Sequence, residues 1–131
     1  MIKNTGILLV ILAFLFSFTA CEKEEESGSY FKLNSDETEM YYDETQCADP
    51  WYEFFSKDEF IPLKKEEKLK KYLENRNIEV LEVAYVKSAR NVDIICSACK
   101  CFTGYRFYVK LKDKEEYVKK LKSMGFVRYN E

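Results

Sequence analysis

The side chains of this 131-residue chain that could carry chemistry are its five cysteines, because the sequence contains no histidine. Cys21 stands alone at the end of an apolar N-terminal stretch, and Cys47 lies just before a Pro-Trp pair. The other three, Cys96, Cys99 and Cys101, are clustered. Thiols can form disulfides or bind soft metal ions as thiolates. Because histidine, the commonest general base, is missing, and the few glycines form no phosphate-binding loop, we predict neither enzymatic activity nor a cofactor.

The residues before Cys21 have the features of a secretory signal. A polar head with Lys3 as its only charge precedes an uncharged run over residues 6–18, and small residues lead up to Cys21. A helix that spans a bilayer needs about 20 apolar residues, and this run is shorter. We therefore predict that residues 1–20 are an export signal.

The four residues Phe18-Thr19-Ala20-Cys21 resemble the lipobox of bacterial lipoproteins. In that family, a small residue precedes a cysteine that receives a diacylglycerol thioether. After cleavage by signal peptidase II, the new amino group receives an acyl chain such as palmitate. The resemblance implies that Cys21 is lipidated and that its acyl chains hold the protein on a membrane. The alternative is an ordinary secreted protein in which Cys21 is free or paired.

Residues 21–26, with the sequence Cys-Glu-Lys-Glu-Glu-Glu, resemble the acidic tag that sends lipoproteins of one large group of Gram-negative bacteria to the outer cell surface. The resemblance implies an outer-membrane location, on the periplasmic or the cell-surface face. The same residues would equally serve as a solvated, extended linker. We expect residues 21–40 to form an acidic flexible tether and residues 41–131 a small cysteine-containing domain.

An even number of thiols remains once Cys21 is lipidated, which in an exported domain indicates two disulfides. A bond between Cys99 and Cys101 would close a very tight ring that disulfide geometry disfavours. We therefore expect Cys47 to bond with Cys99 or Cys101, and Cys96 to take the remaining thiol. A bridge from Cys47 across about 50 residues is worth roughly 4 kcal/mol in the chain-entropy relation.

A four-thiolate metal site is the alternative for the same four cysteines. A C-x2-C-x-C run and one distant cysteine can surround Zn²⁺ or Cu⁺. The familiar zinc arrangement pairs two short knuckles, whereas here Cys47 would come alone. We favour the disulfides and predict no metal site.

The elements that must position these cysteines can be read from hydrophobic periodicity. Residues 64–76 predict an amphipathic helix with its apolar face at Leu69, Tyr72 and Leu73. Residues 78–86 are rich in β-branched side chains and predict a strand, and residues 92–96 predict a shorter one.

The C-terminal third continues this alternation of strand and helix. Residues 105–111 alternate between apolar and polar side chains, which is typical of a strand with one buried face. Asp113 is a candidate N-cap for a second helix that Gly125 ends, and residues 126–129 predict a last strand. The apolar stripe of the helix consists of Tyr117, Val118, Leu121 and Met124.

This order of elements predicts an α+β domain and resembles part of a ferredoxin-like sandwich, an antiparallel sheet with two helices on one face. A first strand is missing from the pattern unless residues 52–55 supply it. Aromatic side chains gather between Trp51 and Phe60. They could form a platform for a sugar or a protein, but we expect them to form or cover the core.

Charge is distributed unevenly along the chain. Residues 22–60 carry 13 acidic and 3 basic side chains, whereas residues 61–131 carry 10 acidic and 17 basic ones. The lysines are spread through helical segments without interleaved aromatics, so we interpret them as solvated faces and predict no nucleic-acid partner. The alternative is that the acidic region folds back over the basic half. The sequence thus predicts a disulfide-stapled binding or structural module on a lipid anchor, with a protein or a glycan as its partner.

Overall fold

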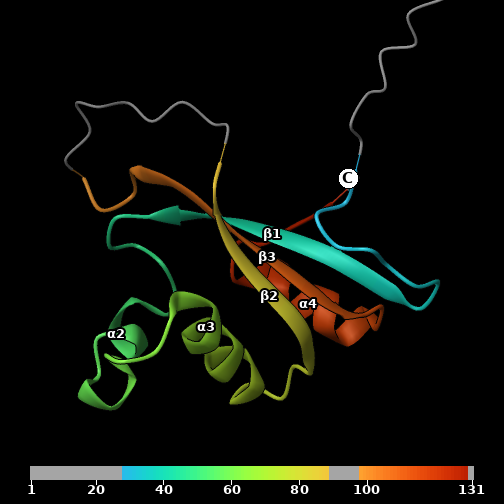
Figure 1. Ribbon diagram of the computed structural model, residues 1–131, viewed down its shortest axis with the longest axis horizontal. Coiled ribbons are helices and arrows are strands. Elements are labelled where there is room, and N and C mark those ends of the chain that lie inside the picture. The colour runs from blue at the N-terminus through green and yellow to red at the C-terminus, as the bar shows by residue number, and fades with distance from the viewer. Residues whose placement is uncertain (1–27, 89–97, 130–131) are drawn as a thin grey trace, which may run out of the picture.

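The centre of the sheet is the long strand β3 (Phe102–Lys112), which pairs antiparallel with β1 (Glu37–Thr45) on one side and β2 (Val80–Lys87) on the other. The short strand β4 (Val127–Arg128) pairs with the outer edge of β1, so the strand order is β2-β3-β1-β4 (Figure 1). The computed structural model describes residues 28–88 and 98–129. The protein is an α+β protein with an antiparallel sheet, as the sequence predicted.

Two helices pack on the same face of this sheet. They are α3 (Lys65–Glu74) and α4 (Glu115–Ser123), and the buried side chains of both belong to one core cluster with those of β1 and β3. Two shorter elements, α2 (Tyr52–Phe55) and the 3-10 helix η1 (Asp58–Phe60), lie between β1 and α3 in the chain. The predicted apolar face of the first helix is confirmed, since Leu69, Tyr72 and Leu73 are all buried.

Strand β3 follows the predicted alternation. Phe107, Val109 and Leu111 are fully buried against the helices, while the alternate residues from Arg106 to Lys112 lie on the other face, which we call the outer face. Tyr105 departs from the pattern because it lies near the strand end and remains 41% exposed.

The first strand of the sheet is β1, and its first four residues lie in the segment that the sequence predicted to be the tether. It begins at Glu37, four residues before the expected start of the domain at residue 41, and residues 52–55 form helix α2 and not a strand. Met40 is the only aliphatic side chain of β1. The strand forms because its inner face still buries Thr38, Met40 and Glu44, while its acidic outer face meets cations of β3.

Those ion pairs connect the acidic and basic parts of the chain. Asp43 binds Arg106 at 2.7 Å, Asp36 binds Lys112 at 2.7 Å, and Glu37 lies 3.3 Å from the ammonium of Lys110. The acidic region therefore folds against basic residues of β3, which was the alternative interpretation of the charge asymmetry.

The start of α4 differs from the sequence prediction, whereas its end agrees with it. The N-cap of α4 is Lys114, without a side-chain cap, and the carboxylate of Asp113 instead binds Arg128 at 2.7 Å. The helix ends before Gly125, as predicted, and this residue adopts a φ of 95° that glycine tolerates best. The strand predicted at residues 92–96 lies outside the described residues.

Trp51 is the centre of the core. Its side chain is 1% exposed, and its ring lies within 6.0 Å, between ring centroids, of five other aromatic rings. Tyr52, the next residue, is 51% exposed. Phe54 and Phe55 are partly buried and pack against the core cluster. The aromatic residues therefore form the core at Trp51 and cover it at Phe54 and Phe55, as expected, and Trp51 does not offer an open ring face to a ligand.

Candidate functional site: a cleft beside the disulfide

Cys47 and Cys99 form a disulfide with their Cα atoms 4.5 Å apart. Backbone hydrogen bonds bring the two segments together, because the amide of Cys47 donates to the carbonyl of Cys99 at 3.2 Å and that of Gln46 to Cys101 at 3.0 Å. This is one of the two pairings that the sequence left open for Cys47, and the predicted presence of a disulfide is confirmed.

The other cysteines are described less completely. Cys101 is buried and also disulfide-bonded, while its predicted partner Cys96 and the predicted lipidation site Cys21 lie outside the described residues. In the disulfide, Cys47 and Cys99 carry no thiolate that could bind a metal ion. Within residues 28–88 and 98–129, no group of three or more acidic or cysteine side chains is placed to hold a metal.

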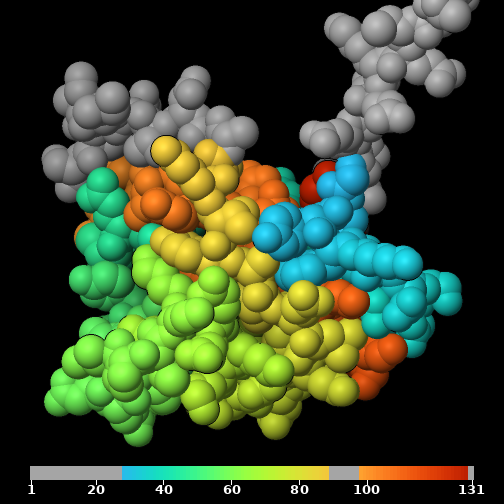
Figure 2. All heavy atoms as spheres, in the orientation of Figure 1, coloured from blue at the N-terminus to red at the C-terminus, as the bar shows by residue number. Residues whose placement is uncertain are grey.

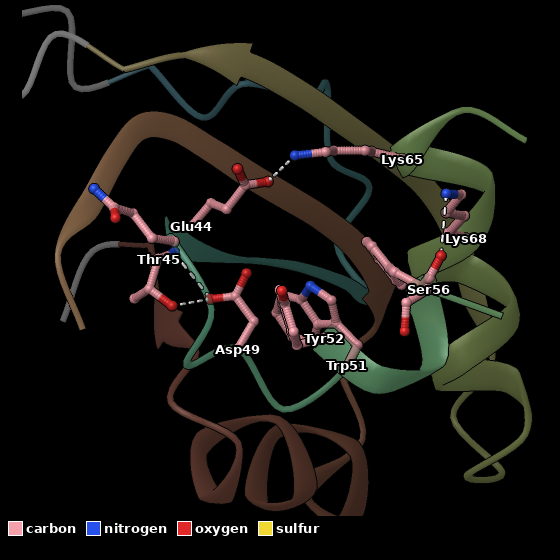
Figure 3. Close-up of a pocket in the computed structure, with 10 residues that line it drawn as sticks. Glu44, Thr45, Asp49, Trp51, Tyr52, Ser56, Lys65 and Lys68 are labelled. Atoms are coloured by element: carbon pink, nitrogen blue, oxygen red, sulfur yellow. Dashed lines mark hydrogen bonds and ion pairs between the residues drawn. The ribbon is translucent and has the colours of Figure 1, made fainter. Parts of the chain in front are cut away.

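A cleft of about 250 Å³ opens next to this disulfide, between the end of β1, the loop that follows it, and helices α2 and α3 (Figure 3). The loop carries Cys47 within it, so the disulfide ties one wall of the cleft to the segment before β3. Seven polar and three aromatic residues line the cleft: Glu44, Thr45, Gln46, Asp49, Trp51, Tyr52, Phe55, Ser56, Lys65 and Lys68.

Glu44 and Lys65 form an ion pair in the cleft in which the carboxylate is buried and the lysine side chain is exposed. The carboxylate of Glu44 is 8% exposed, and the ammonium of Lys65 binds it at 2.7 Å. Lys65 also donates to the hydroxyl of Tyr85 at 3.0 Å. Burial raises the pKa of Tyr85, and the hydrogen bond to Glu44 acts in the same direction. Tyr85 therefore stays a neutral phenol.

Asp49 is held in place by its own loop. The backbone amide and the hydroxyl of Thr45 donate to one of its carboxylate oxygens at 2.9 and 2.6 Å. Burial raises the pKa of Asp49 and the charge of Glu44 adds to the effect, while hydrogen bonds from Thr45 and Tyr42 oppose it. Its carboxylate is thus fixed in direction and less strongly acidic than an exposed aspartate.

Of the two lysines in the cleft, Lys68 has more unused hydrogen-bonding capacity. Its one hydrogen bond within the described part of the chain goes to the carbonyl of Phe55 at 3.3 Å. Since an ammonium has three donors, two are available to a ligand. Lys68 follows Lys65 by one turn of α3, so both lysines lie on the same side of that helix.

The cleft therefore combines two carboxylates and two ammonium groups whose formal charges cancel. Such a site suits a neutral, polar ligand that offers several hydroxyl or amide groups, because carboxylates accept and ammonium groups donate hydrogen bonds. The half-exposed ring of Tyr52 at the rim can contact the apolar side of that ligand.

Sequence reasoning did not select these residues. Glu44 and Asp49 belong to no recognisable motif, and the pattern of the lysines predicts a solvated helix face. The signal that could have found Glu44 is the alternation of β1, which places it on the same face as the buried Met40.

No family model, curated protein or solved structure matches this chain. None of the helices in the described ranges has the length and apolar character needed to cross a membrane.

Proposed function

We propose that the protein is a lipid-anchored, disulfide-stapled binding module of a Gram-negative bacterial envelope, held on the outer membrane through Cys21. Its cleft binds a neutral glycan and performs no catalysis. The observation that carries the proposal is the Cys47–Cys99 disulfide, which ties down the wall of the cleft. Disulfides form and persist in oxidising compartments such as the periplasm and the cell surface. That environment agrees with an exported chain.

We infer that the scaffold is a ferredoxin-like sandwich. Support comes from the connections: β1-α3-β2 and β3-α4-β4 are two β-α-β units. The strands of each unit are separated in the sheet by one strand of the other unit, and both helices contribute to one core cluster. This interleaving leaves the chain between β1 and α3 free to carry α2 and one wall of the cleft.

A glycan fits the chemistry of the cleft better than an ionic ligand does. An anion would approach the carboxylates of Glu44 and Asp49, and a cation would approach two lysines. Neighbouring hydroxyl groups of a sugar can bind a carboxylate and an ammonium at the same time, and one sugar face is apolar enough to contact Tyr52.

Replacing Cys21 tests the anchor. We expect Cys21→Ser to lose all incorporated palmitate, because a hydroxyl cannot form the thioether that precedes acylation. Thr19→Ser, a conservative change in the same motif, should keep the label. Incorporation of radioactive palmitate and the mass of the N-terminal peptide are the measurements. Labelled Cys21→Ser protein would contradict lipidation at this residue.

Removing the charge of Lys68 tests the cleft. Lys68→Met keeps the length of the side chain but loses two available donors, so we expect about tenfold weaker binding of neutral oligosaccharides, the effect of losing one hydrogen bond to a charged group. Lys70→Met is the matched control, because Lys70 lies on the same helix and pairs only with Glu74 among the described residues, at 3.8 Å. Binding to an array of neutral and anionic oligosaccharides measures both.

If Lys68→Met and Lys70→Met bind neutral oligosaccharides equally well, the cleft is not the binding site. A preference for anionic oligosaccharides would contradict the proposed ligand class, since it would require the carboxylates to be neutralised or avoided.

A further inference from the structure

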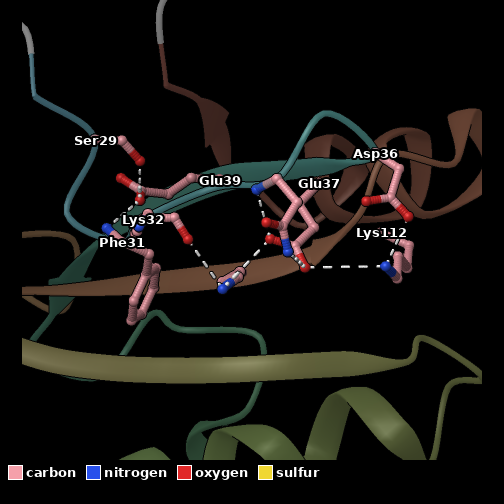
Figure 4. Close-up of polar contacts among 9 residues, drawn as sticks. Ser29, Phe31, Lys32, Asp36, Glu37, Glu39 and Lys112 are labelled. Atoms are coloured by element: carbon pink, nitrogen blue, oxygen red, sulfur yellow. Dashed lines mark hydrogen bonds and ion pairs between the residues drawn. The ribbon is translucent and has the colours of Figure 1, made fainter.

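Glu39 is a buried carboxylate on the outer face of the sheet, far from the cleft. It is 1% exposed, although burying an ionised group is unfavourable unless other groups bind it. Figure 4 shows what binds it: three donors from the segment just before β1 converge on its two oxygens. The hydroxyl of Ser29 donates at 2.5 Å, and the backbone amides of Tyr30 and Phe31 donate at 3.0 and 2.8 Å.

The same segment is held at several further points. The side chain of Phe31 is 8% exposed, and Tyr30 stacks on Tyr108 with ring centroids 4.8 Å apart. The ammonium of Lys110 donates to the carbonyl of Lys32 at 3.0 Å, and the hydroxyl of Tyr129 donates to Gly28 at 2.8 Å. Residues 28–32, which we call the strap, therefore belong to the folded domain although they precede its first strand.

The strap changes the reach of an anchor at Cys21. If the whole expected tether were free, the 20 peptide units from residue 21 to 41 could extend about 70 Å. With the strap bound, only seven units separate Cys21 from Gly28, which limits the reach to about 25 Å. Burying the carboxylate of Glu39 is unfavourable unless donors bind it, and residues 28–32 supply those donors. The consequence of this arrangement is a shorter tether.

The strap also attaches away from the cleft. Glu39 and Glu44 are five residues apart on β1, about 17 Å along the strand, and their side chains lie on opposite faces of the sheet. In Figures 1 and 2, the first described residues, drawn in blue, lie on the side of the molecule away from α2, which borders the cleft.

We propose that the strap, latched by Glu39, holds the folded domain close to the membrane that carries Cys21, within about 25 Å of its lipid. This inference rests on the proposed lipid anchor. It assigns to Glu39 a role in attachment and none in ligand binding.

The test uses the full lipidated protein in vesicles that contain a dansyl-labelled lipid. Trp51, the only tryptophan of the chain, is the energy donor, and transfer to the dansyl group falls steeply with distance. We expect Glu39→Gln to lose energy transfer. Its amide must point an NH₂ group at one of the backbone donors, so the strap detaches. Hydrogen exchange at Tyr30 and Phe31 should become at least about tenfold faster.

Two further variants make the result specific. Phe31→Ala weakens the strap from its own side without changing the sheet, and we expect the same loss of transfer even if Glu39→Gln folds poorly. Asp43→Asn changes a carboxylate of the same strand and face that binds Arg106 instead, and should leave both readouts at the wild-type level.

The proposal is wrong if energy transfer from Trp51 stays at the wild-type level in both Glu39→Gln and Phe31→Ala. This holds whether or not hydrogen exchange at Tyr30 and Phe31 becomes faster. Cys21→Ser separates this outcome from failure of the anchor. If that variant still shows wild-type energy transfer, the lipid anchor itself is wrong, whereas loss of transfer in Cys21→Ser with none in the strap variants removes only the strap's role.

Discussion

Replacing Cys47 and Cys99 together by alanine should lower the free energy of unfolding by about 4 kcal/mol, because the bridge closes a long loop in the unfolded chain. The two cysteines are 52 residues apart, so the unfolded chain without the bridge gains much conformational freedom. For a domain of this size, that loss is a large part of the total stability. Urea unfolding followed by Trp51 fluorescence measures it.

Ala48→Ser is the control for the disulfide prediction. This residue is exposed in the same loop, and a surface substitution should change stability by less than about 0.5 kcal/mol. A loss below about 1 kcal/mol in the double cysteine variant would show that the loop contacts alone hold the two segments together, against the chain-entropy account.

Removal of the Cys47–Cys99 disulfide should also affect ligand binding in the cleft. The loop between Thr45 and Trp51 is fixed by the bridge and by the hydrogen bonds of Asp49 to Thr45. The disulfide thus stabilises the wall as well as the fold. In conditions where the double variant is still folded, we therefore expect weaker binding of neutral oligosaccharides.

The sequence predicted those helices and strands whose own residue pattern shows which face is buried. β3 alternates over its whole length, and α3 and α4 carry apolar stripes, so each element indicates its own buried face. Such an element can be predicted without knowing which other segment packs against it.

β1 could not be found in this way, because its stability depends on β3. Its outer face carries Glu37, Glu39 and Asp43, which are typical of a solvated linker until the cations of β3 and the strap are known to face them. Strand propensity reflects the neighbours of a residue more than the residue itself. The strap has the same limit, since five residues without periodicity give no sign that a buried carboxylate will bind them.

The cleft was missed for a related reason. Its residues come from β1, the loop, α2 and α3, and none of these segments has a motif with fixed spacing. Glu44 and Lys65 are 21 residues apart in the chain, and they meet because α3 packs against the sheet. The four cysteines, by contrast, were recognisable because thiols in an exported chain have few alternatives.

Trp51→Ala should destabilise the domain by about 3–5 kcal/mol, the usual result of removing a fully buried large aromatic side chain. The indole packs among rings from β1, β3, α2, α3 and the segment before β4, so every layer of the molecule would border the cavity. Thermal unfolding followed by circular dichroism is the measurement, since the variant has no tryptophan fluorescence.

Tyr52→Ala is the matched control for Trp51→Ala, because the two residues are adjacent but Tyr52 is half exposed and lines the cleft. We expect Tyr52→Ala to change stability by about 0.5 kcal/mol or less and to weaken oligosaccharide binding through the lost ring contact. The two variants thus separate the core from the site. Equal destabilisation by both would mean that Trp51 and Tyr52 act as one packed unit. Weaker binding without destabilisation in Trp51→Ala would contradict its place in the core.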